Sequence, residues 1–130
     1  MNSVWMPKNI MYVFSDDKFR MINFGIAKDV EMKFNKRKHS YKNRKDIRKE
    51  SDFKNPTLKV ACQFGMSMFD NATKNRFIFE MKAVIQSETT KIVMLNGSND
   101  KKIEWYKIED EDFYIKTIPR LCSVCRRFGS

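Results

Sequence analysis

Two residues stand where their side chains could take part in catalysis. Tyr12 lies in a short apolar and aromatic run, and a phenol near several cations can have its pKa lowered enough to accept a proton. Glu80 lies three residues after Phe77 and four before Val84, within the apolar stripe of a helical pattern. A carboxylate on a core-facing stripe is costly unless it is paired, protonated or bound to a cation. Either a divalent cation or an ion pair with Arg76, one helical turn earlier, would compensate the charge.

A dense run of basic residues is the third feature with chemical meaning. Nine Lys or Arg stand between Lys33 and Lys49, against one acid, Asp46. Because the run lies between expected core elements and contains Tyr41, we expect it to hold a nucleic-acid backbone without reading the base sequence. A nuclear-import patch would use the same charges differently. The expected nucleic-acid-binding residues are Lys36, Lys38, Lys42, Arg44, Lys45, Arg48 and Lys49.

The composition of the whole chain points to a polyanionic partner. The 130 residues include 26 Lys and Arg and 16 Asp and Glu, which gives a net charge of +10. Such a surface favours nucleic acid, an anionic lipid or an acidic protein, with fast and salt-sensitive association. There is no apolar run of the roughly 20 residues that span a bilayer, and no signal-peptide layout. With three cysteines, this predicts an intracellular protein, cytoplasmic or nuclear, with no membrane partner.

Cys122 and Cys125 have the Cys-x-x-Cys spacing of zinc and redox sites. A zinc site normally needs four ligands, and the remaining Cys62 and His39 have no second partner at close spacing. A complete zinc site within one chain is therefore disfavoured, whereas a metal shared between two chains stays open.

The elements that must position these residues alternate between strand-like and helix-like patterns. The spacing of apolar residues changes from period two to period 3.6 at Asp29, a predicted N-cap, and again at Asp70. We therefore predict one α+β domain over residues 1–130, with a small, mainly antiparallel three-stranded sheet flanked by helices. The expected strands lie near residues 10–15, 20–26 and 57–65, and the expected helices near 29–38 and 71–86. In the third strand Leu58, Val60, Cys62 and Phe64 would share one side.

The order of these elements resembles the GIY-YIG nucleases, above all the small type found in phages and large DNA viruses. Ile10-Met11-Tyr12 stands where the family's first strand ends in Tyr, and Asn23-Phe24-Gly25 where its second strand ends in an aromatic-x-Gly element. The stretch 25–34 is similar to the segment that opens the family's helix. Glu80 and Glu104-Trp105-Tyr106 stand where the subgroup has a helix Glu and a Glu-Trp-Phe element. The resemblance covers residues 10–108, and an acidic patch and a Cys-containing basic tail follow in 109–130.

The resemblance implies a metal-dependent endonuclease that hydrolyses phosphodiester bonds of nucleic acid, DNA in preference to RNA. It implies one Mg²⁺ or Mn²⁺ held by Glu80, with Tyr12 as the proton acceptor. Lys33 stands where the family has the Arg that steadies the phosphate, and Arg37, one turn later, is the alternative cation. His39, beside the basic run, is a further candidate for the catalytic site. For a protein of the viral type, the compartment would be an infected host cell.

Two alternatives to an active nuclease remain open. Asn23 replaces the second Tyr of the family motif and Lys33 replaces the helix Arg, which suggests a catalytically weak relative that binds nucleic acid through the same surface. The net charge also fits a basic structural or adaptor protein with an acidic protein partner.

Overall fold

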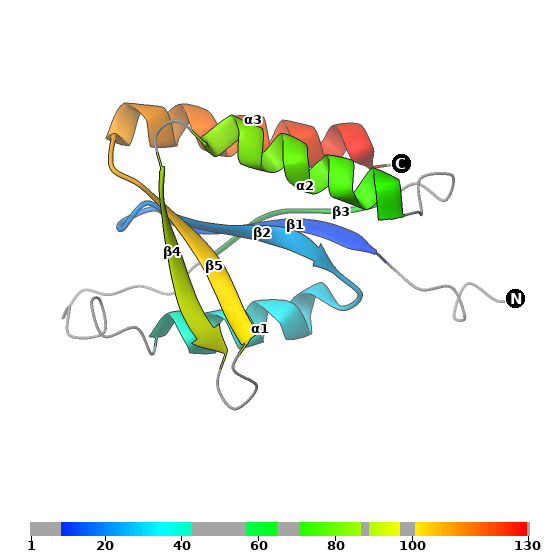
Figure 1. The fold of residues 1–130 in the computed structure, drawn as a ribbon, viewed down its shortest axis with the longest axis horizontal. Coiled ribbons are helices and arrows are strands. Elements are labelled where there is room, and N and C mark those ends of the chain that lie inside the picture. Colours follow the sequence, from blue (N-terminus) through cyan, green and yellow to red (C-terminus); the bar gives the residue numbers. More distant parts are fainter. Residues whose placement is uncertain (1–8, 43–56, 65–70, 87–88, 97–100, 130) are drawn as a thin grey trace, which may run out of the picture.

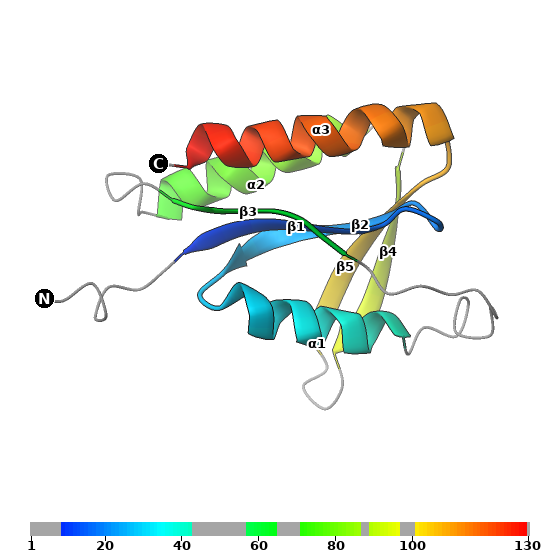
Figure 2. The same ribbon diagram turned by 180° about the vertical axis from the view of Figure 1, so that it is seen from behind.

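Within the residues that the computed structural model describes, 9–42, 57–64, 71–86, 89–96 and 101–129, five strands form one antiparallel sheet in the order β3-β1-β2-β5-β4. Helices α2 and α3 lie side by side on one face of the sheet, and α1 lies on the other (Figures 1 and 2). In chain order the elements are β1 (Ile10–Asp16), β2 (Met21–Ala27), α1 (Val30–Lys42), β3 (Thr57–Gln63), α2 (Asn71–Ile85), β4 (Thr89–Asn96), β5 (Lys101–Ile108) and α3 (Glu111–Phe128).

The β1–β2 hairpin forms because two apolar runs are joined by a polar turn. The Asp16 carboxylate accepts hydrogen bonds from the backbone N–H groups of Lys18 and Phe19, at 2.9 and 3.3 Å. Arg20 closes the turn with a φ of 55°, in the left-handed region. Its backbone carbonyl accepts from Ile108 N–H, and its guanidinium donates to the Ile108 carbonyl. The turn is therefore anchored to the far end of β5.

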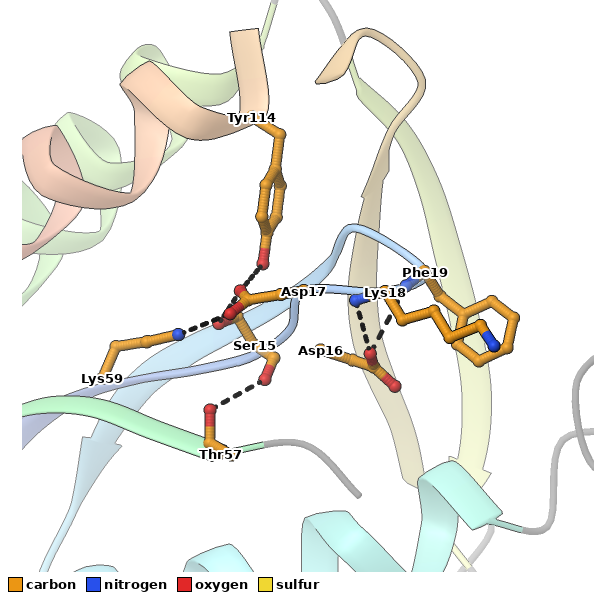
Figure 3. A network of polar contacts seen from close by, with 8 residues as sticks. All are labelled: Ser15, Asp16, Asp17, Lys18, Phe19, Thr57, Lys59 and Tyr114. Carbon is orange, nitrogen blue, oxygen red and sulfur yellow. Dashed lines mark hydrogen bonds and ion pairs between the residues drawn. The ribbon is translucent and has the colours of Figure 1, made fainter. Parts of the chain in front are cut away.

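A second set of polar contacts ties this turn to α3 and β3. The Asp17 carboxylate accepts a hydrogen bond of 2.6 Å from the Tyr114 hydroxyl and pairs with the Lys59 ammonium at 2.8 Å (Figure 3). Ser15 and Thr57 contribute longer bonds of 3.5 and 3.4 Å beside it. Three elements distant in sequence are thus held at one turn.

The sheet buries side chains on both faces, which is why β1 and β2 are almost continuously apolar. Successive strand residues point to opposite faces. The core under α1 contains Tyr12, Phe14, Met21, Ala27 and Trp105, with Phe19, Val30 and Phe34 packed against them. The core under α2 and α3 contains Met11, Val13, Ile22, Phe24, Phe64, Phe77, Met81, Ile85, Tyr106, Ile108, Tyr114, Leu121, Val124, Cys125 and Phe128.

The predicted α+β class is confirmed, and the predicted three-stranded sheet is too small. All three expected strands and both expected helices are present, with bounds that differ by a few residues. The hairpin of β4 and β5 adds the two further strands, because β5 pairs with β2 at Met21 and Ile22. Asp29 caps α1 as expected, accepting from the Met32 backbone N–H at 3.0 Å.

The third strand departs from strict alternation. Val13 faces Val60, whereas the next residue, Phe14, faces Leu58, so Lys59 is an extra residue in a β-bulge. The bulge turns Leu58 away from the side that carries Val60, and Leu58 is exposed. The expected common face of four residues is therefore wrong at its first position.

Helix α3 was not among the expected elements. Asp110 caps it through hydrogen bonds to the backbone N–H groups of Asp112 and Phe113, and it continues through Pro119 to Phe128. No helix in the described ranges is both long enough and apolar enough to cross a membrane.

Candidate functional site

The sheet opens between β2 and β5. The described ladder between these strands pairs Met21 with Lys107 and Ile22 with Tyr106. At the next position the Asn23 side-chain amide donates to the Glu104 carbonyl at 2.8 Å, in place of a backbone bond. Beyond it β4 and β5 turn away from β2 (Figure 1). The result is a fork, with the edge of β2 open from Asn23 onward.

A cavity of about 210 Å³ lies at this fork. It receives side chains from both faces of the sheet and from helices on either side, because the two strands no longer close the gap between them. Three hydroxyl or carboxylate groups, two cations and one amide line it together with two apolar side chains. The lining residues are Tyr12, Asn23, Phe24, Arg37, Ile78, Lys82, Glu104 and Tyr106. We call this the fork cavity.

Contacts within the protein fix the position of the Tyr12 side chain. Its side chain is 2% exposed and its ring stacks on Phe14 with centroids 4.3 Å apart. Gly25 lies opposite Tyr12 across the hairpin, and a Cβ at that position would lie 2.8 Å from the Tyr12 hydroxyl oxygen. Glycine is therefore required at position 25 to leave room for the phenol.

Arg37 of α1 reaches the same phenol. Burial raises the pKa of Tyr12 above its ordinary value of 10.0, and the charge and hydrogen bond of the Arg37 guanidinium oppose that rise without cancelling it. The Tyr12 hydroxyl therefore keeps its proton at neutral pH. The Nε of Arg37 is buried and has no hydrogen-bond partner within the described part of the chain.

Glu104 and Asn23 line the cavity from the two arms of the fork. The Tyr106 hydroxyl donates to the Glu104 carboxylate at 2.6 Å, and burial together with this carboxylate raises the pKa of Tyr106. Asn23 is 4% exposed, and its side-chain oxygen has no hydrogen-bond partner among the described residues. A buried polar atom without a partner costs about 1–3 kcal/mol. This oxygen would gain by binding a cation or a donor.

These oxygens fit a hard divalent cation. Mg²⁺ is commonly held by one or two carboxylates, with water and substrate phosphate completing its shell. Glu104 brings a carboxylate to the cavity lining, and the buried Asn23 side-chain oxygen would become a ligand only if its side chain turned toward the cavity. Within the described ranges no group of three or more His, Cys, Asp or Glu is gathered for metal binding. Any cation here would therefore take most of its ligands from solvent or substrate.

The structure brings Tyr12 and Arg37 together and separates them from Glu80. Glu80 forms an ion pair with Arg127 of α3 and lines a different hollow, between α2 and α3, with Arg120 and Ser123. The predicted Glu80 pair with Arg76 is wrong, because Glu80 pairs with Arg127 and the Arg76 guanidinium lies over the Phe128 ring, 5.8 Å from its centroid. This error follows from the absence of α3 from the sequence prediction.

Comparison with known protein families, with curated proteins and with solved structures found no match.

The other predicted site residues fall into three groups. Lys33 and Lys36 line a neighbouring hollow beside β2, and Lys38 lies over the Phe34 ring, 5.2 Å from its centroid. His39 and Lys42 belong to the last turns of α1. The remaining predicted binding residues lie outside the described ranges, namely Arg44, Lys45, Arg48 and Lys49.

Sequence reasoning did not assign Glu104, Tyr106 or Lys82 to the site. Glu104 and Tyr106 belong to the element that resembles Glu-Trp-Phe. The period-two spacing of Glu104, Tyr106 and Ile108 places them on one face of β5. That spacing is a signal that could have identified Glu104 as the carboxylate on the face of α2.

The Cys-x-x-Cys pair is buried inside α3. Cys122 and Cys125 are free thiols, and Cys62 of β3 is close enough to influence both electrostatically. Burial, aided by the two neighbouring thiols, raises the pKa of Cys125 to about 12. Burial therefore favours the protonated thiol, and both side chains are buried within the fold.

Proposed function

We propose that the protein binds nucleic acid and hydrolyses its phosphodiester bonds at the fork cavity, with the help of one divalent cation. The observation that carries this proposal is the meeting of Tyr12 from β1, Arg37 from α1 and Glu104 from β5 around one cavity. A phenol, a guanidinium and a carboxylate are the groups that phosphodiester hydrolysis can use for proton transfer, phosphate binding and cation binding. The resemblance of the Tyr12 and Asn23-Phe24-Gly25 elements to GIY-YIG nucleases supports the same reaction.

Arg37 is the phosphate-binding group in this proposal. Its planar guanidinium can donate two parallel hydrogen bonds to phosphate oxygens, and its buried Nε has no partner in the described part of the chain. Lys82 of α2 lines the same cavity and adds a second positive charge. Both would stabilise the negative charge that accumulates on the phosphate as water attacks phosphorus.

Tyr12 acts as a proton donor rather than as the acceptor that the resemblance implies. Its raised pKa keeps the hydroxyl protonated. The attacking water forms the new bond to phosphorus and loses one proton to solvent. When the bond between phosphorus and the leaving oxygen breaks, that oxygen takes the bond pair and then the Tyr12 proton. The resulting phenolate lies beside Arg37, whose positive charge stabilises it, and it recovers a proton from solvent. A positioned general acid of this kind contributes about 10²–10⁴-fold in rate.

Glu104 and the Asn23 side-chain oxygen would hold the cation. When bound, Mg²⁺ or Mn²⁺ supplies charge neutralisation at the phosphate and lowers the pKa of coordinated water. The Tyr106 hydroxyl, bonded to the Glu104 carboxylate, fixes the orientation of that carboxylate whether or not a cation is present.

One observation favours a second candidate function, nucleic-acid binding without cleavage. Tyr12 is 2% exposed, so a phosphate reaches its hydroxyl solely through the cavity. If the substrate cannot enter, the same cations still bind the polyanion at the surface.

The test compares two carboxylate variants in a metal-dependent cleavage assay. Glu104→Gln should lower the Mn²⁺-dependent rate at least about 100-fold and leave binding nearly unchanged. Glu80→Gln is the matched control, because it removes a carboxylate outside the fork cavity and should leave the rate within about twofold. Thermal unfolding checks that both variants fold. Equal loss in both variants, or no cleavage by the wild type, would overturn the nuclease; retained binding in the latter case would leave the second candidate.

A further inference from the structure

A second hollow, separate from the fork cavity, lies further along β2. It has a volume of about 380 Å³ and lies between the end of β2 and the first turns of α1. The lining residues are Ile26, Ala27, Lys28, Asp29, Met32, Lys33 and Lys36. It contains three lysines and one carboxylate, and that carboxylate caps α1 by accepting from the Met32 N–H.

The residues that line the two hollows follow one another along both β2 and α1. On β2, Asn23 and Phe24 line the fork cavity, and Ile26 and Ala27 line the second hollow. Three residues along a strand correspond to about 10 Å. On α1, Arg37 lines the first hollow and the adjacent Lys36 lines the second. We call this path along the open edge of β2 the β2-edge groove.

The chemistry of the β2-edge groove suits a polynucleotide chain. Lys28 and Lys36 are exposed, and Arg37 and Lys82 bring further cations to the fork cavity. Met32 is 53% exposed beside them, and its polarizable thioether suits contact with a flat base. Proteins that follow a single strand combine a positively charged groove with side chains that contact the bases, and the lysines with Met32 provide the charge and one such contact.

The dimensions of the fork cavity select against a duplex. The fork cavity has a volume of about 210 Å³. This space accepts a phosphate with part of one nucleotide and excludes a base pair with its second strand. Because Tyr12 is nearly fully buried, a phosphate on the surface of a duplex would stay away from its hydroxyl.

We propose that the β2-edge groove binds single-stranded nucleic acid and feeds one strand to the fork cavity. This inference rests on the proposed function for the position of the scissile phosphate, whereas the preference for a single strand is a property of the groove. The strand lies along β2 over Lys28 and Lys36, and its backbone reaches Arg37 and Tyr12 at the fork.

The experiment measures binding by fluorescence anisotropy in EDTA, so that metal-dependent cleavage does not interfere. The probes are a fluorescein-labelled oligodeoxynucleotide of about 12 nucleotides and the same strand in a blunt duplex. We expect the single strand to bind at least tenfold more tightly than the duplex. The double variant Lys28→Glu/Lys36→Glu should weaken single-strand binding at least tenfold. The control Lys116→Glu/Arg126→Glu changes the net charge equally, on exposed positions of α3 across the sheet, and should weaken it less than threefold.

Equal or tighter binding of the duplex, or equal loss in the two double variants, overturns this inference. Cleavage is then assayed separately with Mn²⁺ on the same two probes. If the single strand binds through Lys28 and Lys36 but is not cleaved, the proposed nuclease fails and the groove assignment stands. If the duplex is bound and cleaved as well as the single strand, the nuclease stands and the groove assignment fails.

Discussion

Tyr12 and Gly25 show how one side chain determines what its neighbour can be. The ring of Tyr12 occupies the space that a side chain at position 25 would need. Gly25 needs no special backbone angle for this role; it is required because anything larger collides with the phenol. The same hydroxyl is the atom that Arg37 approaches. The Tyr12 hydroxyl oxygen therefore matters both for packing against Gly25 and for the contact with Arg37.

Substitution at Gly25 tests this close approach. We expect Gly25→Ala to destabilise the protein by about 1–3 kcal/mol, because a rigid ring in a filled core must move to admit the methyl group. In a Tyr12→Phe background the hydroxyl at 2.8 Å is absent and the ring carbon Cζ at 3.2 Å remains. The cost of the alanine should fall by about 1 kcal/mol in that background. Urea unfolding of the four proteins provides the measurement, and the same cost in both backgrounds would contradict the assigned contact.

At the scale of elements, the hairpin and the first two helices follow from local patterns, whereas α3 and the fork do not. Pro119 interrupts the helical pattern of the tail and predicts a break. The helix continues because Pro119 and Ile115, whose carbonyl loses its bond, are exposed and water can replace that bond. The apolar stripe was nevertheless present in the sequence. Its buried positions are Tyr114, Thr117, Leu121, Cys122, Val124, Cys125 and Phe128.

The same distinction between local sequence patterns and tertiary contacts explains which site residues could be predicted. Tyr12 and Arg37 could be predicted because a hairpin and the helix that follows it are adjacent in sequence. Glu104 enters the cavity because β5 pairs with two residues of β2 and then turns away, a fact of tertiary structure with no local pattern. Glu80 was misplaced because its partner Arg127 lies on α3, 47 residues away in sequence.

The contacts of Asp17 with α3 and β3 predict an acid-sensitive connection between elements. The hydrogen bonds from Lys59 and Tyr114 hold the pKa of Asp17 below its ordinary value of 3.8, although burial acts in the opposite direction. A lowered pKa in the folded state means that the unfolded chain binds the proton first. The stabilisation is therefore complete above about pH 4 and is lost as the pH falls through the folded-state value.

Asp17→Asn should reduce stability by about 1 kcal/mol at neutral pH and make the melting temperature fall less steeply below about pH 4. Glu109→Gln is a suitable control, since it also removes an exposed carboxylate near the start of α3. Thermal unfolding followed by circular dichroism between about pH 2 and pH 7 gives both slopes. Parallel curves for wild type and Asp17→Asn would exclude the connection as a source of pH dependence.

The whole molecule should lose stability in alkali through three buried phenols. The pKa values of Tyr12, Tyr106 and Tyr114 are all raised above 10.0, in each case chiefly by burial. Because the unfolded chain releases these protons first, their stabilisation is complete below about pH 10 and is lost as the pH rises through the folded-state values. We expect tyrosinate absorbance and the loss of helical circular dichroism to rise together above that pH. Ionisation of all tyrosines near pH 10 in a protein that is still folded would contradict this.

The net charge of +10 predicts that binding of a single strand depends on salt concentration, and this dependence shows which basic residues contact phosphate groups. Each phosphate contact contributes about 0.7 to the slope of log affinity against log salt concentration. Replacing Lys28 and Lys36 by Ala should therefore lower the slope by about 1.4, and replacing Arg44, Lys45, Arg48 and Lys49 by Ala should lower it by about 2.8, with equal loss for all base sequences.

Anisotropy titrations between about 50 and 200 mM salt measure both slopes. If the quadruple variant keeps the full slope, Arg44, Lys45, Arg48 and Lys49 make no phosphate contacts and the β2-edge groove carries the binding. If the Lys28 and Lys36 variant keeps it while the quadruple variant loses it, the strand is held by those four residues, and the groove has no part in the path to Tyr12.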